Sequence, residues 1–415
     1  MPKKENLKKA QVGKNDEFYT QYIDIQREIN AYLEYNPNVF KDKIVLLPCD
    51  DPEWSNFTKF FAQNFQNFGL KKLISTSYAN DKKNNVMVQL SLFESESPKF
   101  DKGKTNSHGK IFVLDGDENH SGNININDLK WDYLNGDGDF RSEEVKKLRD
   151  EADIIITNPP FSLFREFVDW IMEGNKQFLI IGNINAISYK EVFPLIQDNK
   201  MWTGNRFNQR VNGKNMTFLV PDSYEMKGTE LYTDDKGKKY ISVAGTGWFT
   251  NLEHGRRHQP LQLMTMEDNI KYSKHKEIKG RGYLKFDNYD AIDVPFTDAI
   301  PSDYRGVMGV PITFLTKYNP SQFRIIGIAK TPIGSHLRTK VYNKQIQHSM
   351  KNGKEILSNV SKLNDGPAIY SENIPEKYPY YEVDGKYYIS TYARILIEFK
   401  EDFINENNVE NWFNC

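Results

Sequence analysis

The segment Asn158-Pro159-Pro160-Phe161 directly follows residues 153–157, an apolar run typical of a buried strand. Two consecutive prolines fix φ at both positions and keep the Pro159 carbonyl out of a helix. The Asn158 side-chain oxygen and that carbonyl are two acceptors for the two hydrogens of one amine, and the Phe161 ring offers a face to a heteroaromatic base. This spacing predicts methyl transfer to a ring-conjugated amine. A rigid Pro-Pro turn is the structural alternative.

A second polar segment, containing Cys49, Asp50 and Asp51, follows the apolar run at residues 44–47. A dinucleotide-binding turn would carry glycines whose amides receive phosphate. This turn has no glycine, and its two carboxylates repel phosphate and favour a cation. S-adenosylmethionine carries a protonated amine and a sulfonium, so we predict it as the cofactor. The alternative for Asp51 is an N-cap in front of Pro52.

A third candidate is Asp139 with Phe140, in the segment "NGDGDFRS". The carboxylate can accept from the exocyclic amine of an adenine, and the ring can contact its π-surface. The alternative is a Gly/Asp turn that caps a helix starting near Ser142.

The surrounding pattern predicts the elements that position these residues. Apolar strands alternate with helices up to about residue 252, which favours a doubly wound, Rossmann-like α/β domain with a parallel sheet covered on both faces. Ligands then bind at the carboxyl ends of the strands. Expected strands lie at 44–47, 71–77, 153–157 and 176–183, and expected helices at 15–35, 55–65 and 163–174. The first helix carries apolar residues spaced by four, at Ile25, Ile29 and Leu33.

The domain boundaries follow from composition. Residues 1–15 form a lysine-rich arm, residues 16–252 the catalytic domain with an irregular insertion at about 80–130, and residues 253–415 a mixed α+β region. Strand candidates in the insertion are 85–93 and 110–116, and those in the last region are 310–318, 323–329 and 393–399.

Bulk properties narrow the class of protein. A chain of 415 residues, 38% hydrophobic and 27% charged, fits two globular domains. It has no apolar run of about 18 residues and no secretory leader, so we expect a cytoplasmic protein and no membrane partner. The two cysteines, Cys49 and Cys415, argue against a disulfide framework and against a zinc site, and we expect no metal requirement.

The net charge of −1 does not by itself indicate nucleic acid, but the distribution of charge does. Residues 254–285 contain eight Lys/Arg against three acids, and residues 330–354 contain six Lys/Arg and no acid. These windows favour a polyanion on this half of the chain, with solvated surface as the alternative. The DNA-binding candidates are Arg256, Arg257, Arg338, Lys340 and Gln345.

Taken together, these segments resemble the EcoRI-type family of adenine-specific (N6) DNA methyltransferases. "NPPF" is similar to the catalytic motif of amino-methyltransferases, and "LLPCDDPEWSNF", "PPFSLFREFV" and "FLIIGNINAI" are characteristic of the EcoRI type. "NDEFYTQ" resembles the segment that folds over the methionine part of the cofactor, which implies contacts from Phe18, Tyr19 and Thr20. The resemblance covers residues 12–252 well and extends more loosely to the end.

The sequence departs from the broader methyltransferase pattern in two places. The glycine-rich first motif is absent. The acid that usually holds the cofactor ribose after the second strand is also absent, and Tyr78 stands there as a residue that can stack on adenine.

The resemblance implies a site-specific enzyme that flips an adenine out of duplex DNA and methylates it, in a restriction–modification or phage-protection role. It also implies a C-terminal target-recognition region, association with the nucleoid through DNA, and a separate cognate endonuclease as partner. Alternatives are an RNA amino-methyltransferase acting on N6-adenine or N2-guanine, a glutamine-amide methyltransferase, a binding protein that has lost activity, and a fused nuclease using residues 221–227.

Overall fold

The computed structural model describes residues 19–79, 100–101, 103–115, 131–207, 216–220, 230–235, 237–359 and 362–403. The chain divides into two compact units. The first comprises Met1–Ala186 with Met201–Gly255, and the second comprises Ile187–Lys200 with Arg256–Cys415. Residues 187–200, which lie inside the catalytic domain expected from the sequence, therefore belong to the second unit.

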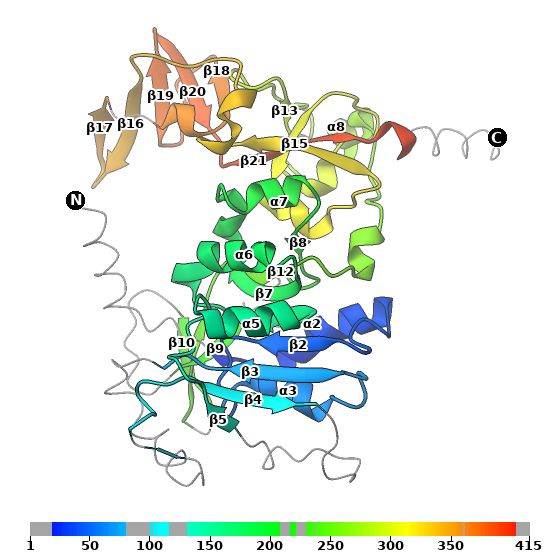
Figure 1. The fold of residues 1–415 in the computed structure, drawn as a ribbon. Helices are drawn as coiled ribbons and strands as arrows, with labels where there is room; N and C mark the ends of the chain where they lie inside the picture. The colour runs from blue at the N-terminus through cyan, green and yellow to red at the C-terminus, as the bar shows by residue number, and fades with distance from the viewer. Residues whose placement is uncertain are drawn as a thin grey trace, which may run out of the picture. The chain divides into compact units, whose positions relative to one another are not determined.

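The first unit is built on an eight-stranded mixed sheet with the order β5-β4-β3-β2-β6-β7-β12-β8. The four central strands, β3, β2, β6 and β7, run parallel, and the flanking strands pair antiparallel with their neighbours (Figure 1). The strands are β2 (Ile44–Leu47), β3 (Lys72–Thr76), β4 (Lys110–Leu114), β5 (Trp131–Tyr133), β6 (Ile154–Thr157), β7 (Gln177–Asn183), β8 (Trp202–Thr203) and β12 (Thr246–Thr250).

The expected α/β class is confirmed, but the expectation of a parallel sheet holds only at its centre. The central strands are Ile- and Leu-rich runs buried on both faces, as parallel strands require. β4 lies in the region expected as an insertion, yet it pairs with β3 over Leu73–Thr76. β12 returns beside β7 in the antiparallel direction.

Two helices, α2 (Tyr22–Tyr35) and α3 (Asn56–Gln63), cover one face of this sheet. Their buried side chains share a core with Val45 and Leu47 of β2; they include Ile25, Ile29, Tyr32, Phe57, Phe60 and Phe61. The expected first helix begins later than predicted, because Tyr19–Thr20 form the strand β1. Its buried stripe runs through Tyr32, while Leu33 is only half-buried.

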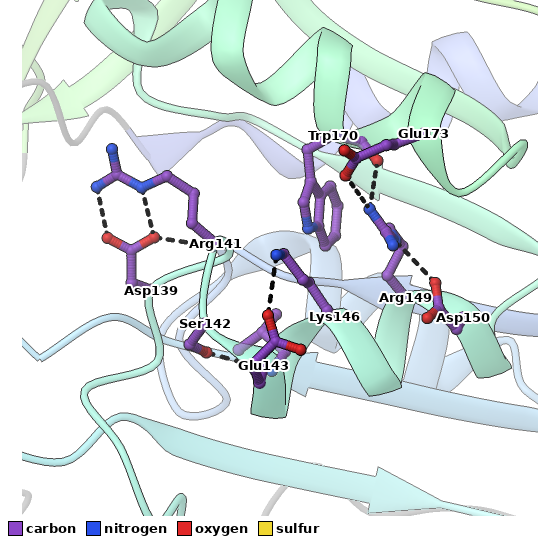
Figure 2. A network of polar contacts seen from close by, with 10 residues as sticks. Asp139, Arg141, Ser142, Glu143, Lys146, Arg149, Asp150, Trp170 and Glu173 are labelled. Carbon is purple, nitrogen blue, oxygen red and sulfur yellow. Dashed lines mark hydrogen bonds and ion pairs between the residues drawn. The ribbon is translucent and has the colours of Figure 1, made fainter.

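The helices α5 (Glu143–Glu151) and α6 (Phe164–Glu173) cover the other face of the sheet (Figure 1). Arg149 donates to the Trp170 carbonyl at 2.9 Å and pairs with Glu173 at 3.2 Å (Figure 2). Its guanidinium lies 5.3 Å from the Trp170 ring centre. These contacts fix the two helices to each other, and with them the segments that precede each helix.

A small sheet of order β1-β9-β11-β10 completes the first unit. Its strands are β1 (Tyr19–Thr20), β9 (Thr217–Val220), β10 (Glu230–Thr233) and β11 (Lys239–Ser242). Tyr19 and Thr20 pair antiparallel with Leu219 and Phe218. β1 is therefore held in place by a strand that lies about 200 residues later in the sequence.

The second unit contains a four-stranded sheet of order β13-β14-β21-β15 and a five-stranded sheet of order β17-β16-β19-β20-β18. Its α-helices are α7 (Phe193–Gln197) and α8 (Met266–Tyr272). The strands are β13 (Ile292–Asp293), β14 (Met308–Pro311), β15 (Phe323–Ala329), β16 (Ile346–Lys351), β17 (Lys354–Ser358), β18 (Ala368–Ser371), β19 (Tyr380–Val383), β20 (Lys386–Ser390) and β21 (Arg394–Phe399).

The strands expected at 323–329 and 393–399 are confirmed as β15 and β21. The strand expected at 310–318 is wrong over most of its length. β14 ends at Pro311, and Ile312–Lys317 form a 3-10 helix. Pro311 has no amide to continue the ladder, and its fixed φ suits the start of a helical turn. Among the helices of the described segments, none combines the length and apolar character that crossing a bilayer requires.

Candidate functional site

The strand order of the large sheet reverses between β2 and β6. From β2 the chain moves to β3 on one side, whereas β6 and β7 lie on the other side. Loops diverge at such a point and leave room for a ligand at the carboxyl ends of the strands. Asp50 follows β2 and Asn158 follows β6, so the topology brings two of the predicted site segments to the same edge.

Asp50 is the polar centre of this edge and is only 6% exposed. Its carboxylate accepts hydrogen bonds from the Ser55 and Thr157 hydroxyls, each at 2.6 Å. The Asp50 amide donates to the Thr76 carbonyl at 2.9 Å. Burial raises the pKa of Asp50 to about 7; the two hydroxyl bonds oppose that rise and the neighbouring charge of Asp51 adds to it. Asp50 therefore joins the ends of β2, β3 and β6, through its backbone to β3 and through its carboxyl group to β6.

Asp51 shapes the turn after β2 and is not the N-cap of α3. Its carboxylate accepts from the Glu53 amide at 2.9 Å, whereas Ser55 caps the helix by accepting from Phe57. Lys110 on β4 pairs with Glu53 at 2.6 Å and lies 3.5 Å from Asp51. The buried Lys110 ammonium therefore offsets part of the negative charge of this turn, which the sequence predicts to bind a cationic ligand. Because β4 is distant in sequence, the pattern of the turn alone did not indicate Lys110.

The N-terminal segment lies beside the same turn. The Asn56 side chain, at the start of α3, donates to the Thr20 carbonyl at 2.7 Å. Thr20 is 4% exposed, and within the described segments no hydrogen-bond partner reaches its hydroxyl oxygen. A buried hydroxyl without a partner is unfavourable. Tyr19 belongs to β1, and Phe18 lies outside the described residues.

The loop that carries Asp139 is held against β3 by close backbone approaches. The Ala79 amide donates to the Asp137 carbonyl at 2.7 Å. Gly138 has φ +80°, and a Cβ there would collide with the Ser77 carbonyl; a Cβ at Gly109 would meet the same oxygen. Only glycine permits this approach, so the loop is fixed at the carboxyl end of β3.

Arg141 donates three hydrogen bonds to the Asp139 carboxylate (Figure 2). Its amide donates at 2.8 Å and its Nε at 2.9 Å to Oδ1, and a terminal nitrogen lies 2.6 Å from Oδ2. Burial opposes the charged form, but the bonds from Arg141 outweigh it and lower the pKa of Asp139. Arg141 also pairs with Glu166 on α6 at 2.9 Å. Sequence analysis did not identify Arg141.

Phe140 points into the core rather than outward. The side chain is 5% exposed and packs edge to face against Phe167 and Trp170, at 5.0 and 5.7 Å between ring centres. Its contact with a cofactor adenine stays a prediction. Tyr78, the other residue expected to stack on adenine, follows β3 and is exposed, and Cys49 is half-buried in the turn after β2.

The Asn158-Pro159-Pro160-Phe161 segment forms an extended exit from β6 followed by a 3-10 turn, Phe161–Leu163, that leads into α6. The Pro160 carbonyl accepts from the Leu163 amide at 2.9 Å. In the described part of the chain, no hydrogen bond reaches the Pro159 carbonyl. The Pro159 carbonyl therefore keeps an acceptor position next to the half-buried Asn158 and Phe161, and its role in holding a target amine stays a prediction.

A buried carboxylate on α2 was not anticipated from the sequence. Glu28 is fully buried; it accepts from the Asn205 amide at 2.7 Å, the Arg206 amide at 2.9 Å and the Tyr32 hydroxyl at 2.9 Å. Burial raises the pKa of Glu28 to about 7 against these bonds. Gly204 lacks the side chain that would collide with it. Glu28 positions the loop after β8, and the only sequence signal was an acid within the apolar stripe of α2.

The predicted DNA-binding residues all belong to the second unit and differ in environment. Arg257 is 3% exposed, hydrogen-bonds to Asn199 and lies 5.8 Å from the Tyr318 ring centre. Arg338 donates to the Asn364 carbonyl at 2.7 Å. Lys340 is exposed and pairs with Asp287 at 2.6 Å, and Gln345 donates to the Tyr342 carbonyl at 2.7 Å. Arg256 is half-buried in the short helix Gly255–His258.

An α/β sheet with an Asn-Pro-Pro-Phe exit beside a buried aspartate fits the class of amino-group methyltransferases. The sequence matches the family described as adenine-specific methyltransferase EcoRI over residues 6–399. The chain belongs to this family and is an adenine-specific methyltransferase, which confirms the resemblance seen in the sequence.

Individual relatives agree with the family. The chain is 45% identical to the type II methyltransferase M.EcoRI of Escherichia coli over 324 residues, covering 78% of this chain and 89% of that one. It is 34% identical to the type II methyltransferase M.MpnI of Mycoplasma pneumoniae over 351 residues, covering 83% and 93%. M.MgeORF184P of Mycoplasma genitalium is also 34% identical, over 352 residues, covering 84% and 94%. No solved structure matches the chain.

Proposed function

We propose that this chain transfers a methyl group from S-adenosylmethionine to the N6 amine of an adenine flipped out of a short duplex DNA site. The observation that carries the proposal is the position of Asn158 and Pro159. They follow Thr157, whose hydroxyl donates to Asp50 at 2.6 Å across the point where the strand order reverses. The three relatives named type II methyltransferases support a role in restriction and modification. The proposal includes a separate endonuclease as partner and a location in the cytoplasm.

The residues at this edge fit the proposed cofactor. S-adenosylmethionine supplies an electrophilic methyl group bound to a cationic sulfur. The buried Thr20 hydroxyl has no hydrogen-bond partner in the described segments, which a ligand could supply, and a cation beside Asp50 would stabilise the charged form of a carboxyl group whose pKa burial has raised. Asp139 presents a carboxylate for the adenine amine. We propose the same doubly wound, Rossmann-like binding mode that the sequence predicted.

The chain's own groups hold the target. Asn158 and Pro159 accept the two hydrogens of the target amine, so that its lone pair points toward the methyl group. Phe161 receives the flipped base by stacking, which offsets an extrusion cost of a few kcal/mol. The amine nitrogen would form its new bond to the methyl carbon as the carbon–sulfur bond of the sulfonium breaks, with S-adenosylhomocysteine as the leaving group, and the extra proton on nitrogen would pass to solvent. Catalysis in this site is mostly positioning in a dry environment.

The second unit is our proposed target-recognition region. Arg338, Lys340 and Gln345 lie in or near loops between β15 and β16, and Arg256 lies in a short helix, so they are candidates for contacts to phosphates and base edges. The burial of Arg257 supports a structural role for it. Binding through such cations predicts an affinity for DNA that falls steeply with salt.

The proposal is tested with Asn158→Ala and the matched control Asn38→Ala, an exposed asparagine after α2. Asn158→Ala should bind S-adenosylhomocysteine as the unchanged protein does and lose methyl transfer to duplex DNA, whereas Asn38→Ala should keep both. Transfer by Asn158→Ala at the unchanged rate would overturn the site assignment. Parallel assays on RNA and on a glutamine peptide identify the substrate, and activity on either one without activity on DNA would overturn the proposed substrate.

A further inference from the structure

The Asp139 carboxylate has one acceptor position left after its contacts to Arg141. An ionised carboxylate offers about four lone-pair positions. Oδ1 accepts from the Arg141 amide at 2.8 Å and from its Nε at 2.9 Å, and Oδ2 accepts from a terminal nitrogen of the same guanidinium at 2.6 Å. Three positions are filled, and the fourth belongs to Oδ2.

Arg141 is itself held in place by two further contacts. Glu166 on α6 pairs with its other terminal nitrogen at 2.9 Å, and its guanidinium lies 5.4 Å from the centre of the Phe140 ring. The fork of the guanidinium imposes one orientation on the carboxylate plane, which a lysine could not do. Asp139 is therefore oriented by a side chain that the sequence motif does not include.

We propose that Arg141 is a positioning residue that sets the enzyme's preference for a 6-aminopurine cofactor, by keeping Asp139 an oriented anion with a single acceptor position. This inference rests on the proposed function, since it takes Asp139 as the partner of the cofactor adenine. An anion with one position left accepts a hydrogen from a 6-amino group and repels the oxygen of a 6-oxo group. A protonated Asp139 would lose this distinction because it can donate as well as accept.

The charged groups around Asp139 support this role for Arg141. Asp137 accepts from the Asp139 amide at 3.0 Å, and Glu166 stands on the far side of the guanidinium. Both are acids, and Arg141 is the group whose bonds lower the pKa of Asp139 against the effect of burial. Without Arg141, burial favours the protonated form.

The test uses calorimetry to measure how tightly S-adenosylhomocysteine and its 6-oxo analogue bind to the full-length chain. The unchanged protein should prefer the 6-amino compound. Arg141→Gln should weaken binding of the 6-amino compound about 10-fold, the size of one charge-assisted hydrogen bond, and reduce the preference, more strongly at pH 5.5 than at pH 8. Arg141→Lys keeps the charge without the fork and should fall between the two. Lys147→Gln, which removes an exposed cation from α5, is the matched control.

Asp139→Ala separates the two proposals. If Asp139→Ala keeps both affinity and preference, the cofactor adenine binds elsewhere and the proposed site is wrong. If Asp139→Ala loses the preference while Arg141→Gln and Arg141→Lys retain it at both pH values, only the inference about Arg141 is overturned. Thermal melting accompanies each variant, and Arg141→Lys decides the outcome if Arg141→Gln does not fold.

Discussion

Replacing Asp50 with asparagine removes a buried ionisable group while keeping its size and shape. The carboxyl group is 6% exposed and its pKa lies at about 7 in the folded protein, against an ordinary value of 3.8. Because the folded-state pKa is the higher one, the contribution of Asp50 to stability is fully present below pH 3.8. It is lost as the pH rises through 7, since the unfolded chain releases this proton first.

The size of the effect follows from the pKa values. Between pH 5 and pH 7 the unfolded chain carries an ionised Asp50 while the folded protein keeps its proton, and above pH 7 both states are ionised. Two pH units at about 1.4 kcal/mol each predict a loss of about 3 kcal/mol in the free energy of unfolding between pH 5 and pH 8. Asparagine does not titrate, so Asp50→Asn should lack this loss. Altered hydrogen bonds to Ser55 and Thr157 add an offset that is independent of pH.

The assay is urea denaturation of both proteins at pH 5 and pH 8, followed by tryptophan fluorescence. Trp248 is fully buried in the core that contains β2 and reports on its unfolding. The difference in unfolding free energy between Asp50→Asn and the unchanged protein should shift by about 3 kcal/mol in favour of the variant from pH 5 to pH 8. Titration of Glu28 occurs in both proteins and cancels in this difference. An unchanged difference at the two pH values would refute the burial argument for Asp50.

Three further predictions, two of them with a control variant, test the packing within the two units. Gly138→Ala places a Cβ against a backbone carbonyl at positive φ, so it should lower the free energy of unfolding by about 2 kcal/mol and weaken cofactor binding. In the control Gly136→Ala the nearest neighbour of the new Cβ would be 3.5 Å away, so the loss should be smaller. Chemical denaturation measures the stability of the two variants, and calorimetry measures their cofactor binding. Glu28→Ala leaves two buried amides unpaired and should cost about 3 kcal/mol, seen in the urea midpoint. Arg257→Ala should lower the melting temperature without changing the salt dependence of DNA binding, and Arg256→Ala should leave the melting temperature unchanged. Equal behaviour of the two glycine variants, equal behaviour of the two arginine variants, or an unchanged urea midpoint for Glu28→Ala would contradict the corresponding packing argument.

Local sequence was sufficient for the elements whose boundaries are set by local chemistry. β2 occupies Ile44–Leu47 as predicted, because an apolar run ends at a proline and two aspartates. β6 and α6 flank the two prolines, which forbid regular structure at that position. The family resemblance came from the same short segments, because their residue types and order can be read without knowing how distant parts of the chain pack.

Pairing between distant segments could not be read from local patterns. The apolar residues of Ile312–Lys317 favour a strand, but the pairing of β14 with β21 ends at Pro311 and the residues that follow form a 3-10 helix. The strand expected at 110–116 is present as β4, but its antiparallel direction, like that of β12, depends on which neighbours the strands meet.

The sequence by itself determined the chemistry of the candidate site: an amide, a rigid carbonyl and an aromatic ring in Asn158, Pro159 and Phe161, with carboxylates in the preceding segments. The tertiary structure decided the state of those carboxylates. In the folded chain Asp50 is buried and accepts hydrogen bonds from two hydroxyls, and Asp139 is paired with Arg141. Composition fixes which groups can ionise, but desolvation and the distance to a counter-charge fix whether they do. Asp50 is desolvated only once segments as distant as Thr157 have packed against it, whereas the counter-charge of Asp139 lies in the same loop and its distance is set by the conformation of that loop.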